Sequence, residues 1–290
     1  MPFRKGVNGK GGMPSDFRPV EHGLDRLTVH VRNGVVFATG DPATPPFETY
    51  HGDTMLRYFD RVFDGRDLRV LGYTRQRIPA NWKLMFENIK DPYHASLLHV
   101  FLVSFGLFRA DNPSETRMDP TGRHSVLVSS RGQDTASADV ARLKTFTTLA
   151  LEDDRLLDPV REFPGTTTVV MQTLWPNLIV QQQSNTLALR QIVPRGPESF
   201  DLLWTFFGYV DDDEEMVTRR LRQANLMGPA GLVSMDDSEV MQLAQQGVVA
   251  DPAGEGMLDV GLDDNGDVDH IVTEVAIREF YRHYREVMGL

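Results

Sequence analysis

Short apolar stretches and alternating apolar and polar positions dominate the middle of the chain. The stretch at 68–78 predicts a strand that ends before Pro79. Further stretches rich in Val, Thr, Ile, Leu and Phe predict five more strands, at 126–130, 166–174, 178–183, 187–193 and 200–210. Turn pairs such as Pro176-Asn177 separate several of them. Because short connections join successive strands, we expect an antiparallel meander.

Helical periodicity flanks this block of strands on both sides. Asn81 is a suitable N-cap for a helix that Pro92 interrupts and that resumes over 93–101. After the strands, 213–227 and 234–246 predict helices that end at Gly228-Pro229 and Gly247, and 277–288 carries an apolar stripe. Strands in one block with helices before and after predict an α+β fold, an antiparallel sheet with helices on one face.

A separate, smaller unit precedes this region. Residues 1–17 are rich in glycine and aperiodic, which is typical of a loop or arm. The stretches 27–32 and 35–39 alternate around Asn33-Gly34, the strongest short-range signal for a β-hairpin. Three prolines between 42 and 46 close the unit, which reads as the end of a small β-domain.

The absence of cysteine limits the chemistry most. The 290 residues include no Cys, which excludes disulfides, a thiolate nucleophile, Cys-ligated zinc and a Cys-held iron–sulfur cluster within this chain. Any metal must therefore bind imidazole and carboxylate groups. Lys and Arg number 30 against 41 Asp and Glu, a net charge of −11 that argues against a nucleic-acid partner. No apolar run is long enough to cross a membrane and no signal peptide is visible, so we expect a cytoplasmic protein.

Two of the eight histidines, His94 and His99, lie close together in the sequence, in a segment dense in Glu, Asn, Asp and Tyr. Residues five apart on a regular helix point roughly 140° apart. The two rings therefore converge on one metal only if the helix is distorted or the side-chain torsions compensate. The alternative is a capped, partly exposed helix with two solvated histidines.

A second segment, Gly228-Pro229-Ala230-Gly231 followed by Ser234 and Asp236-Asp237, also has two interpretations. Ser234 and Asp237 fit a capping box at the start of a helix. The functional interpretation is that one of the two aspartates joins His94 and His99. Two histidines and one carboxylate form the facial triad of non-heme Fe(II) oxygenases, which leaves the other metal positions open for O₂ and substrate.

Together, these two segments resemble a known family. The run from Asn81-Trp82-Lys83 through Asp91-Pro92-Tyr93-His94 to His99, and the Gly228–Asp237 segment about 140 residues later, are similar to the two signatures of Rieske non-heme iron aromatic-ring-hydroxylating oxygenases, large (alpha) subunit. The resemblance covers essentially the whole chain. It implies a helix-grip (START/Bet v1-like) catalytic domain at 51–290, preceded at 1–50 by the C-terminal remnant of a Rieske-type β-domain.

The resemblance also implies roles for individual residues. His94, His99 and Asp237, the later of the paired acids, correspond to the ligands of a mononuclear Fe(II). Asp91 matches the carboxylate that links a ligand histidine to a cluster histidine of the neighbouring subunit in the family's trimer. Asn88 and Met227 fall where the family lines its substrate pocket.

Partners and substrate follow from the same resemblance. The segment 90–99 is most similar to salicylate-, anthranilate- and terephthalate-type oxygenases, which implies O₂ and an aromatic acid as substrates; no arginine is assigned to the acid's carboxylate. We also expect a homotrimer, a ferredoxin or reductase as electron donor, and in some members a small beta subunit. The family's [2Fe–2S] Rieske cluster needs two Cys and two His, so this chain does not ligate it. The sequence is expected to start just past the cluster ligands, as a truncated gene product or with a partner that supplies the cluster.

Two other functions fit the same residues. One is a truncated, catalytically incompetent helix-grip module that binds a ligand or assembles with a partner. The other is a zinc hydrolase that uses the same triad, which metal analysis would distinguish.

Overall fold

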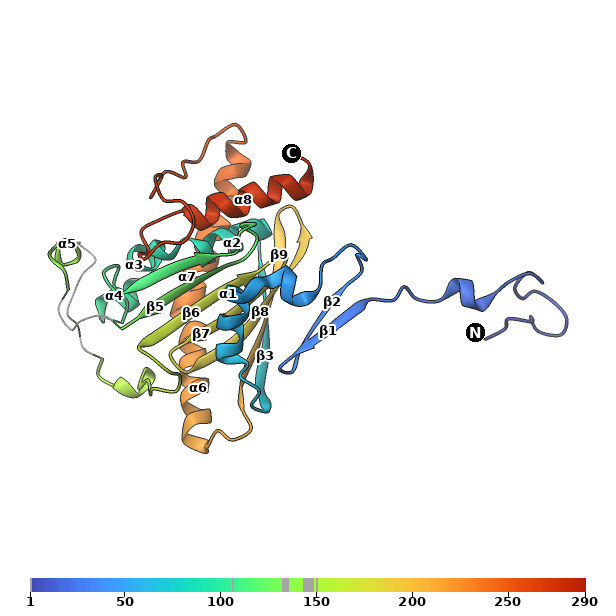
Figure 1. Ribbon diagram of the computed structural model, residues 1–290, viewed down its shortest axis with the longest axis horizontal. Coiled ribbons are helices and arrows are strands. Elements are labelled where there is room, and N and C mark those ends of the chain that lie inside the picture. The colour runs from blue at the N-terminus through green and yellow to red at the C-terminus, as the bar shows by residue number, and fades with distance from the viewer. Residues whose placement is uncertain (1, 106, 132–135, 143–148, 150) are drawn as a thin grey trace.

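The structure is a computed structural model that describes residues 2–105, 107–131, 136–142, 149 and 151–290. A seven-stranded antiparallel sheet has the order β3-β9-β8-β7-β6-β5-β4 (Figure 1). Its strands are β3 (Leu68–Ile78), β4 (Ser114–Met118), β5 (Ser125–Ser130), β6 (Thr167–Leu174), β7 (Leu178–Gln183), β8 (Thr186–Gly196) and β9 (Ser199–Tyr209). The predicted meander is confirmed. Strand β3 pairs with the last strand, β9, and forms one edge of the sheet. The short, polar β4 was not predicted, because its sequence has no apolar alternation.

Helices pack on both faces of the sheet. They are α1 (Phe47–Val62), α2 (Trp82–Lys90), α3 (Ala95–Leu98), α4 (Val100–Ser104), α5 (Ala138–Ala141), α6 (Glu214–Met227), α7 (Leu232–Ala250) and α8 (Val275–Met288), with short 3₁₀ turns η1 (Pro19–His22), η2 (Pro92–His94) and η3 (Asp154–Leu156). Among the described residues, no helix is both long and apolar enough to cross a membrane.

The prediction of helices on one face only is wrong. In Figure 1, α1 lies in front of the sheet and α7 behind it. Met55 and Phe59 of α1 form one core with Val180 and Leu187, whereas the alternate residues of the same strands belong to a second core with α2, α7 and α8. Successive side chains of a strand point to opposite faces of the sheet. A strand with few polar positions therefore needs other elements packed on both faces to bury its apolar side chains. The apolar spacing of α1 fits a helix, but this helix was not predicted from the sequence. The reasons are the preceding prolines and Gly52, which has a positive φ of 73°.

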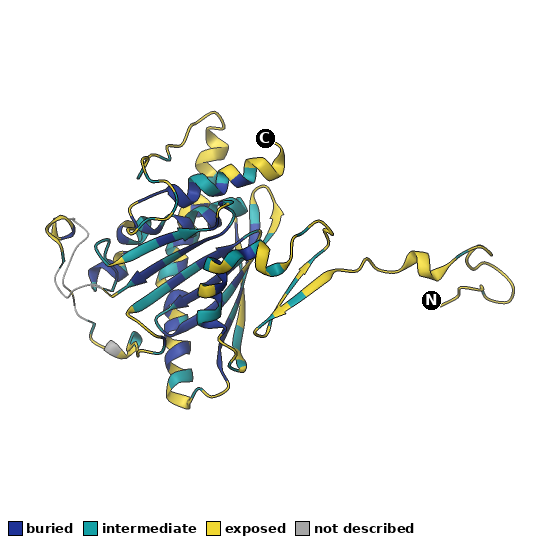
Figure 2. Ribbon diagram, in the orientation of Figure 1, coloured by how far each residue is buried: buried dark blue, intermediate teal, exposed yellow. Residues whose placement is uncertain are grey.

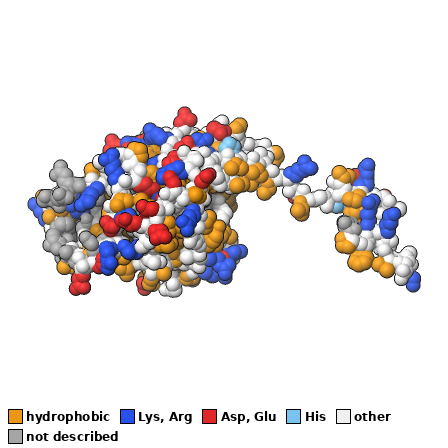
Figure 3. Space-filling model, turned by 90° about the horizontal axis from the view of Figure 1, so that it is seen from below, with side chains coloured by type: hydrophobic (Ala, Val, Ile, Leu, Met, Phe, Trp, Pro, Cys, Tyr) orange, Lys and Arg blue, Asp and Glu red, His pale blue; other side chains and the backbone are white. Residues whose placement is uncertain are grey.

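The Asn33-Gly34 hairpin is confirmed. Strands β1 (Thr28–Arg32) and β2 (Val35–Thr39) pair in register, and both turn residues have positive φ, 48° and 87°, as a type I′ turn requires. Arg32 binds Asp60 of α1 through two hydrogen bonds of 2.7 and 2.5 Å, which tie the hairpin to the body. The segment before β1 extends away from the body and is almost wholly exposed (Figures 1 and 2), and Figure 3 shows Lys and Arg side chains gathered along it.

A buried histidine pair beneath α1 makes stability depend on pH. His124 is fully buried and stacks on His51 with ring centroids 5.1 Å apart. Its Nδ1 accepts the Trp175 amide at 3.0 Å, and its Nε2 donates to the Tyr50 carbonyl at 3.1 Å. These bonds hold the neutral ring. Burial lowers the pKa of His124 well below its ordinary value of 6.5, although the Asp119 carboxylate opposes the shift.

We therefore expect His124 to destabilise the fold in mild acid. Below pH 6.5, His124 becomes protonated in the unfolded chain but stays neutral in the folded chain. The stability that the neutral, buried His124 contributes is therefore present above pH 6.5 and is lost as the pH falls. Between pH 7.5 and 5.5 the loss is about 1.4 kcal/mol. Urea unfolding of the metal-free wild type and of His124→Gln at both pH values measures it. Equal pH dependence in the two proteins would contradict this assignment.

Candidate metal centre and its pocket

A broken helix brings the two histidines together. The Asn81 side chain caps α2 by accepting the Lys83 amide, and α2 ends at Lys90, since the C-cap residue Asp91 has a φ of −105° and a ψ of 82°, which are not helical. The sequence predicts that the helix resumes as one piece over 93–101. The structure has three short segments there instead, η2, α3 and α4. His94 ends η2, and His99, with φ −82° and ψ 71°, separates α3 from α4. These breaks supply the distortion that convergence of residues five apart requires.

Two glycines bring the aspartate to the histidines. A Cβ on Gly231 would lie 2.0 Å from the carbonyl oxygen of Leu226, and one on Gly228 would lie 2.6 Å from that of Ala224. Only glycine permits a turn this tight between α6 and α7. The predicted Ser234 cap is wrong, because α7 already begins at Leu232 with Gly231 as its N-cap. Asp237 thus lies inside the helix, where it is buried and faces the histidines.

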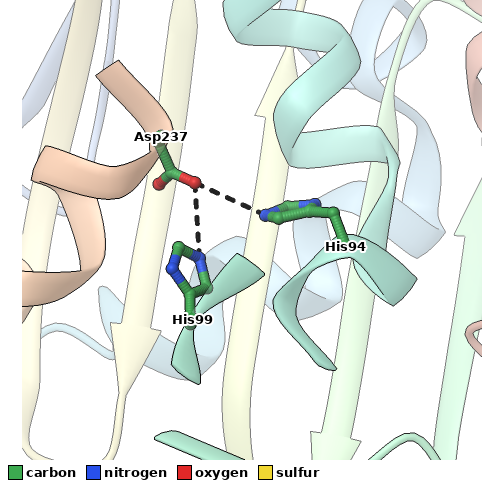
Figure 4. A group of neighbouring side chains, drawn as sticks. All are labelled: His94, His99 and Asp237. Carbon is green, nitrogen blue, oxygen red and sulfur yellow. Dashed lines mark ion pairs between the residues drawn. The ribbon is translucent and has the colours of Figure 1, made fainter. Parts of the chain in front are cut away.

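His94, His99 and Asp237 converge on one point between these elements (Figure 4). Asp237 Oδ1 lies 3.5 Å from His94 Nε2 and 3.3 Å from His99 Nε2. The candidate ligand atoms all lie within 4.8 Å of one another. Over the described residues, no other group of three or more His, Cys, Asp or Glu side chains has this arrangement.

Hydrogen bonds behind the rings orient the Nε2 atoms toward Asp237. His94 Nδ1 donates to the main-chain oxygen of Asp91, and His99 Nδ1 donates to Asp236 Oδ2 at 3.3 Å. With the proton on Nδ1, the lone pair of each neutral ring is on Nε2. The two neighbouring aspartates therefore have different positions: Asp237 contacts both Nε2 atoms, and Asp236 contacts only the back of His99.

Electrostatics keeps Asp237 ionised. Burial alone would raise its pKa, but hydrogen bonds and charge attraction from His94 and His99 outweigh burial and lower it far below the ordinary value. Burial would lower the pKa of His94, but its contacts with Asp237 outweigh that and raise it. A divalent cation would be held by the ionised Asp237 carboxylate and by the Nε2 lone pairs of His94 and His99.

The donor set fits iron. Two imidazole nitrogens and one carboxylate oxygen are ligands that Fe(II) accepts in proteins, and here they come from one side of the site. Asn88 supports the carboxylate, since its Nδ2 donates to Asp237 Oδ1 at 3.0 Å. The Oδ1 of Asn88 is buried without a partner. The site therefore has the residues for a mononuclear centre.

A pocket lies between the triad and the sheet. Asn88 and Met227, for which the family resemblance implies a place in the pocket, both line it beside the three candidate ligands. The sheet side consists of Leu127, Val169, Met171, Gln181, Gln183 and Arg190. The strand register explains this wall, because Met171 pairs with Gln181 and Val169 with Gln183, and paired side chains share a face. The wall is apolar along β5 and β6 and polar along β7 and β8.

Arg190 is a charged pocket residue that the sequence did not single out. It is 3% exposed, and burial lowers the pKa of its guanidinium to about 10 although Asp237 opposes the shift. The signal was a charged residue within a run of otherwise apolar positions, Leu187 to Val193. Asp91, in contrast, lies at the edge of the site, where its carboxylate is 3.8 Å from His94 Nδ1 and 23% exposed.

Comparison with known proteins identifies the family of the chain. Residues 64–290 match the family described as "Ring hydroxylating alpha subunit (catalytic domain)". The chain is 51% identical to the large oxygenase component of salicylate 5-hydroxylase from Ralstonia sp, covering all of this chain and 70% of that protein. It is 41% identical to the large subunit of anthranilate 1,2-dioxygenase from Burkholderia cepacia, covering all of this chain and 69% of that one.

Solved structures confirm the fold. Naphthalene 1,2-dioxygenase from Rhodococcus sp., solved with indole bound, superposes with a TM-score of 0.72 at 20% identity, over 90% of this chain and 66% of that one. The expected helix-grip arrangement of an antiparallel sheet and helices is thus present. The chain belongs to the family of ring-hydroxylating oxygenase alpha subunits, and residues 64–290 contain its catalytic domain.

Proposed function

We propose that this chain holds Fe(II) between His94, His99 and Asp237 and uses O₂ to hydroxylate an aromatic acid. The observation that carries the proposal is the convergence of these three side chains over a pocket with an apolar wall. The names of the relatives support the substrate class, since salicylate and anthranilate are both aromatic acids.

The residues of the chain divide the work between them. The triad holds the metal from one side, and Asn88 fixes the Asp237 carboxylate. Leu127, Val169 and Met171 form an apolar wall against which an aromatic ring packs and from which water is excluded. When bound, the iron supplies the redox chemistry that ordinary side chains lack, the activation of O₂ beside the ring.

Electrons must come from outside these 290 residues, because they include no cysteine and so ligate no Rieske cluster. We propose that they enter at Asp91, which joins the back of His94 to the partly exposed edge of the site. We also propose a homotrimer that receives electrons from a ferredoxin or reductase and that includes a small beta subunit. The same proposal includes a cytoplasmic location and a division of the chain into domains at 1–50 and 51–290, and family membership supports it.

Hydrogen peroxide provides the test. It carries the oxygen and the two electrons that O₂ and a reductase would otherwise supply, so one peroxide converts one C–H bond to C–OH and leaves one water. We expect the Fe(II)-loaded full chain, given peroxide and salicylate, to form one positional isomer of dihydroxybenzoate. Liquid chromatography with mass spectrometry measures it.

Asp237→Ala with the same total iron is the matched control, because free iron and peroxide hydroxylate the ring without selectivity. A mixture of isomers from both proteins would show chemistry in solution only. Bound iron and bound salicylate without product would favour the ligand-binding module.

A further inference from the structure

Arg190 occupies an unusual position for an arginine. It lies on β8 opposite Ile179 of β7, on the face of the sheet that lines the pocket, and one diagonal step from Gln181. Its neighbours on the same face of β8, Ala188 and Ile192, belong to the apolar core. The guanidinium thus reaches the pocket from a rigid central strand, opposite the helices that carry the candidate metal ligands.

The guanidinium has no carboxylate partner among the described residues. Its Nε is buried without a hydrogen bond, and Nη2 contacts only the Met171 sulfur at 3.5 Å. The group stacks on the Trp204 ring, 4.8 Å from the centroid. Asp237 already contacts both histidines and Asn88. The contrast is Arg220, equally buried, which binds the carboxylates of both Glu162 and Asp212.

Comparison with a buried lysine, Lys90, shows why the lack of a carboxylate partner matters for Arg190. Within the part of the chain that the structure describes, Lys90 also has no carboxylate at ion-pair distance, but its Nζ donates to the hydroxyls of Ser125 and Thr173. Burial lowers the pKa of Lys90 to about 7, so it can shed its proton. Arg190 keeps its charge at neutral pH, and a buried charge without a partner is costly. An anion that enters the pocket would remove that cost.

The geometry points to Arg190 as the group that binds the carboxylate of the aromatic acid and selects acids against neutral aromatic compounds. This inference rests on the proposed function for the presence of an aromatic ligand. A guanidinium offers two parallel N–H donors that match a carboxylate, and the free Nε supplies one of them. The apolar wall of β5 and β6 then holds the ring between Arg190 and the triad. Gln181 Oε1, also buried without a partner on the same face, can accept a hydrogen bond from a hydroxyl group on the ring, whereas its amide nitrogen already donates to Gln183.

The test is ligand binding without turnover. Isothermal titration of the full, metal-free chain compares salicylate with salicylamide, its neutral amide. We expect the wild type to prefer salicylate by about tenfold or more, and Arg190→Met to weaken salicylate about 100-fold while salicylamide changes less than about threefold. Arg190→Lys should fall between, since it keeps the charge and loses the paired donors.

Arg195→Met is the matched control. Arg195 lies on the same strand, but it is partly exposed and pairs with Asp201 outside the pocket, so both affinities should stay unchanged. Circular dichroism and urea midpoints show whether each variant folds. The inference is overturned if the wild type binds acid and amide equally, if it binds neither, or if folded Arg190→Lys and Arg190→Met keep wild-type affinity for salicylate. Because no iron takes part, a failure of the iron site would leave this result standing.

Discussion

Replacing Arg220 with Met should destabilise the fold by about 3–5 kcal/mol, because buried Asp212 loses its arginine partner and buried Glu162 keeps only the longer ion pair with Arg66, at 3.9 Å. Arg220 is 1% exposed and donates to Asp212 at 2.7 and 3.0 Å and to Glu162 at 3.1 and 2.5 Å. A further bond of 2.8 Å reaches the carbonyl of Asn185 in the turn between β7 and β8. The residue thereby fixes α6, and with it the turn that places Asp237.

Arg219→Met is the control, because Arg219 is the neighbouring residue and also forms ion pairs. Its partners Asp158 and Glu215 are 51% and 78% exposed, so water solvates them when the arginine is lost. We expect a cost of about 1 kcal/mol or less. Urea unfolding at neutral pH compares the two. Similar losses in both variants would contradict the role assigned to Arg220.

Replacing Asp237 with Ala should abolish iron binding. The change removes the one carboxylate that contacts both Nε2 atoms, and it leaves only two neutral donors. We expect the iron content after anaerobic loading with Fe(II) and desalting to fall from about one to below about 0.1 per chain. Elemental analysis of the desalted protein measures it.

Asp236→Ala separates the two adjacent aspartates. Asp236 contacts only Nδ1 of His99, from behind the ring. Its loss should weaken iron binding by about 10- to 100-fold and still leave a loadable site. The reverse order, with iron lost in Asp236→Ala and kept in Asp237→Ala, would show that the ligand is assigned to the wrong residue.

The sequence predicted most of the sheet because local signals and tertiary packing agree there. Strands β3 and β7 have the predicted bounds, and the Asn33-Gly34 turn forms because those two residues tolerate positive φ. The glycines before α7 were part of a motif, and the structure shows the steric reason for them at Gly228 and Gly231. Where chemistry dictates a residue type directly, sequence reasoning was effective.

The remaining features depend on contacts that local patterns do not encode. Helix α1 covers the second face of the sheet, which follows from burial on both sides of the strands and not from its own sequence. No proline or glycine in the sequence indicates the helix break at His99. Arg190 was missed because its significance lies in what it lacks, a partner within a buried pocket, and only the fold shows that.

One iron is expected to bind between His94, His99 and Asp237. Crystals of the full chain loaded with Fe(II), measured on both sides of the iron absorption edge, test it most directly. We predict one anomalous peak per chain, in contact with both Nε2 atoms and the Asp237 carboxylate. No peak at the triad, or a peak only in the acidic pocket lined by Glu162, Asp211 and Asp213, would contradict the account.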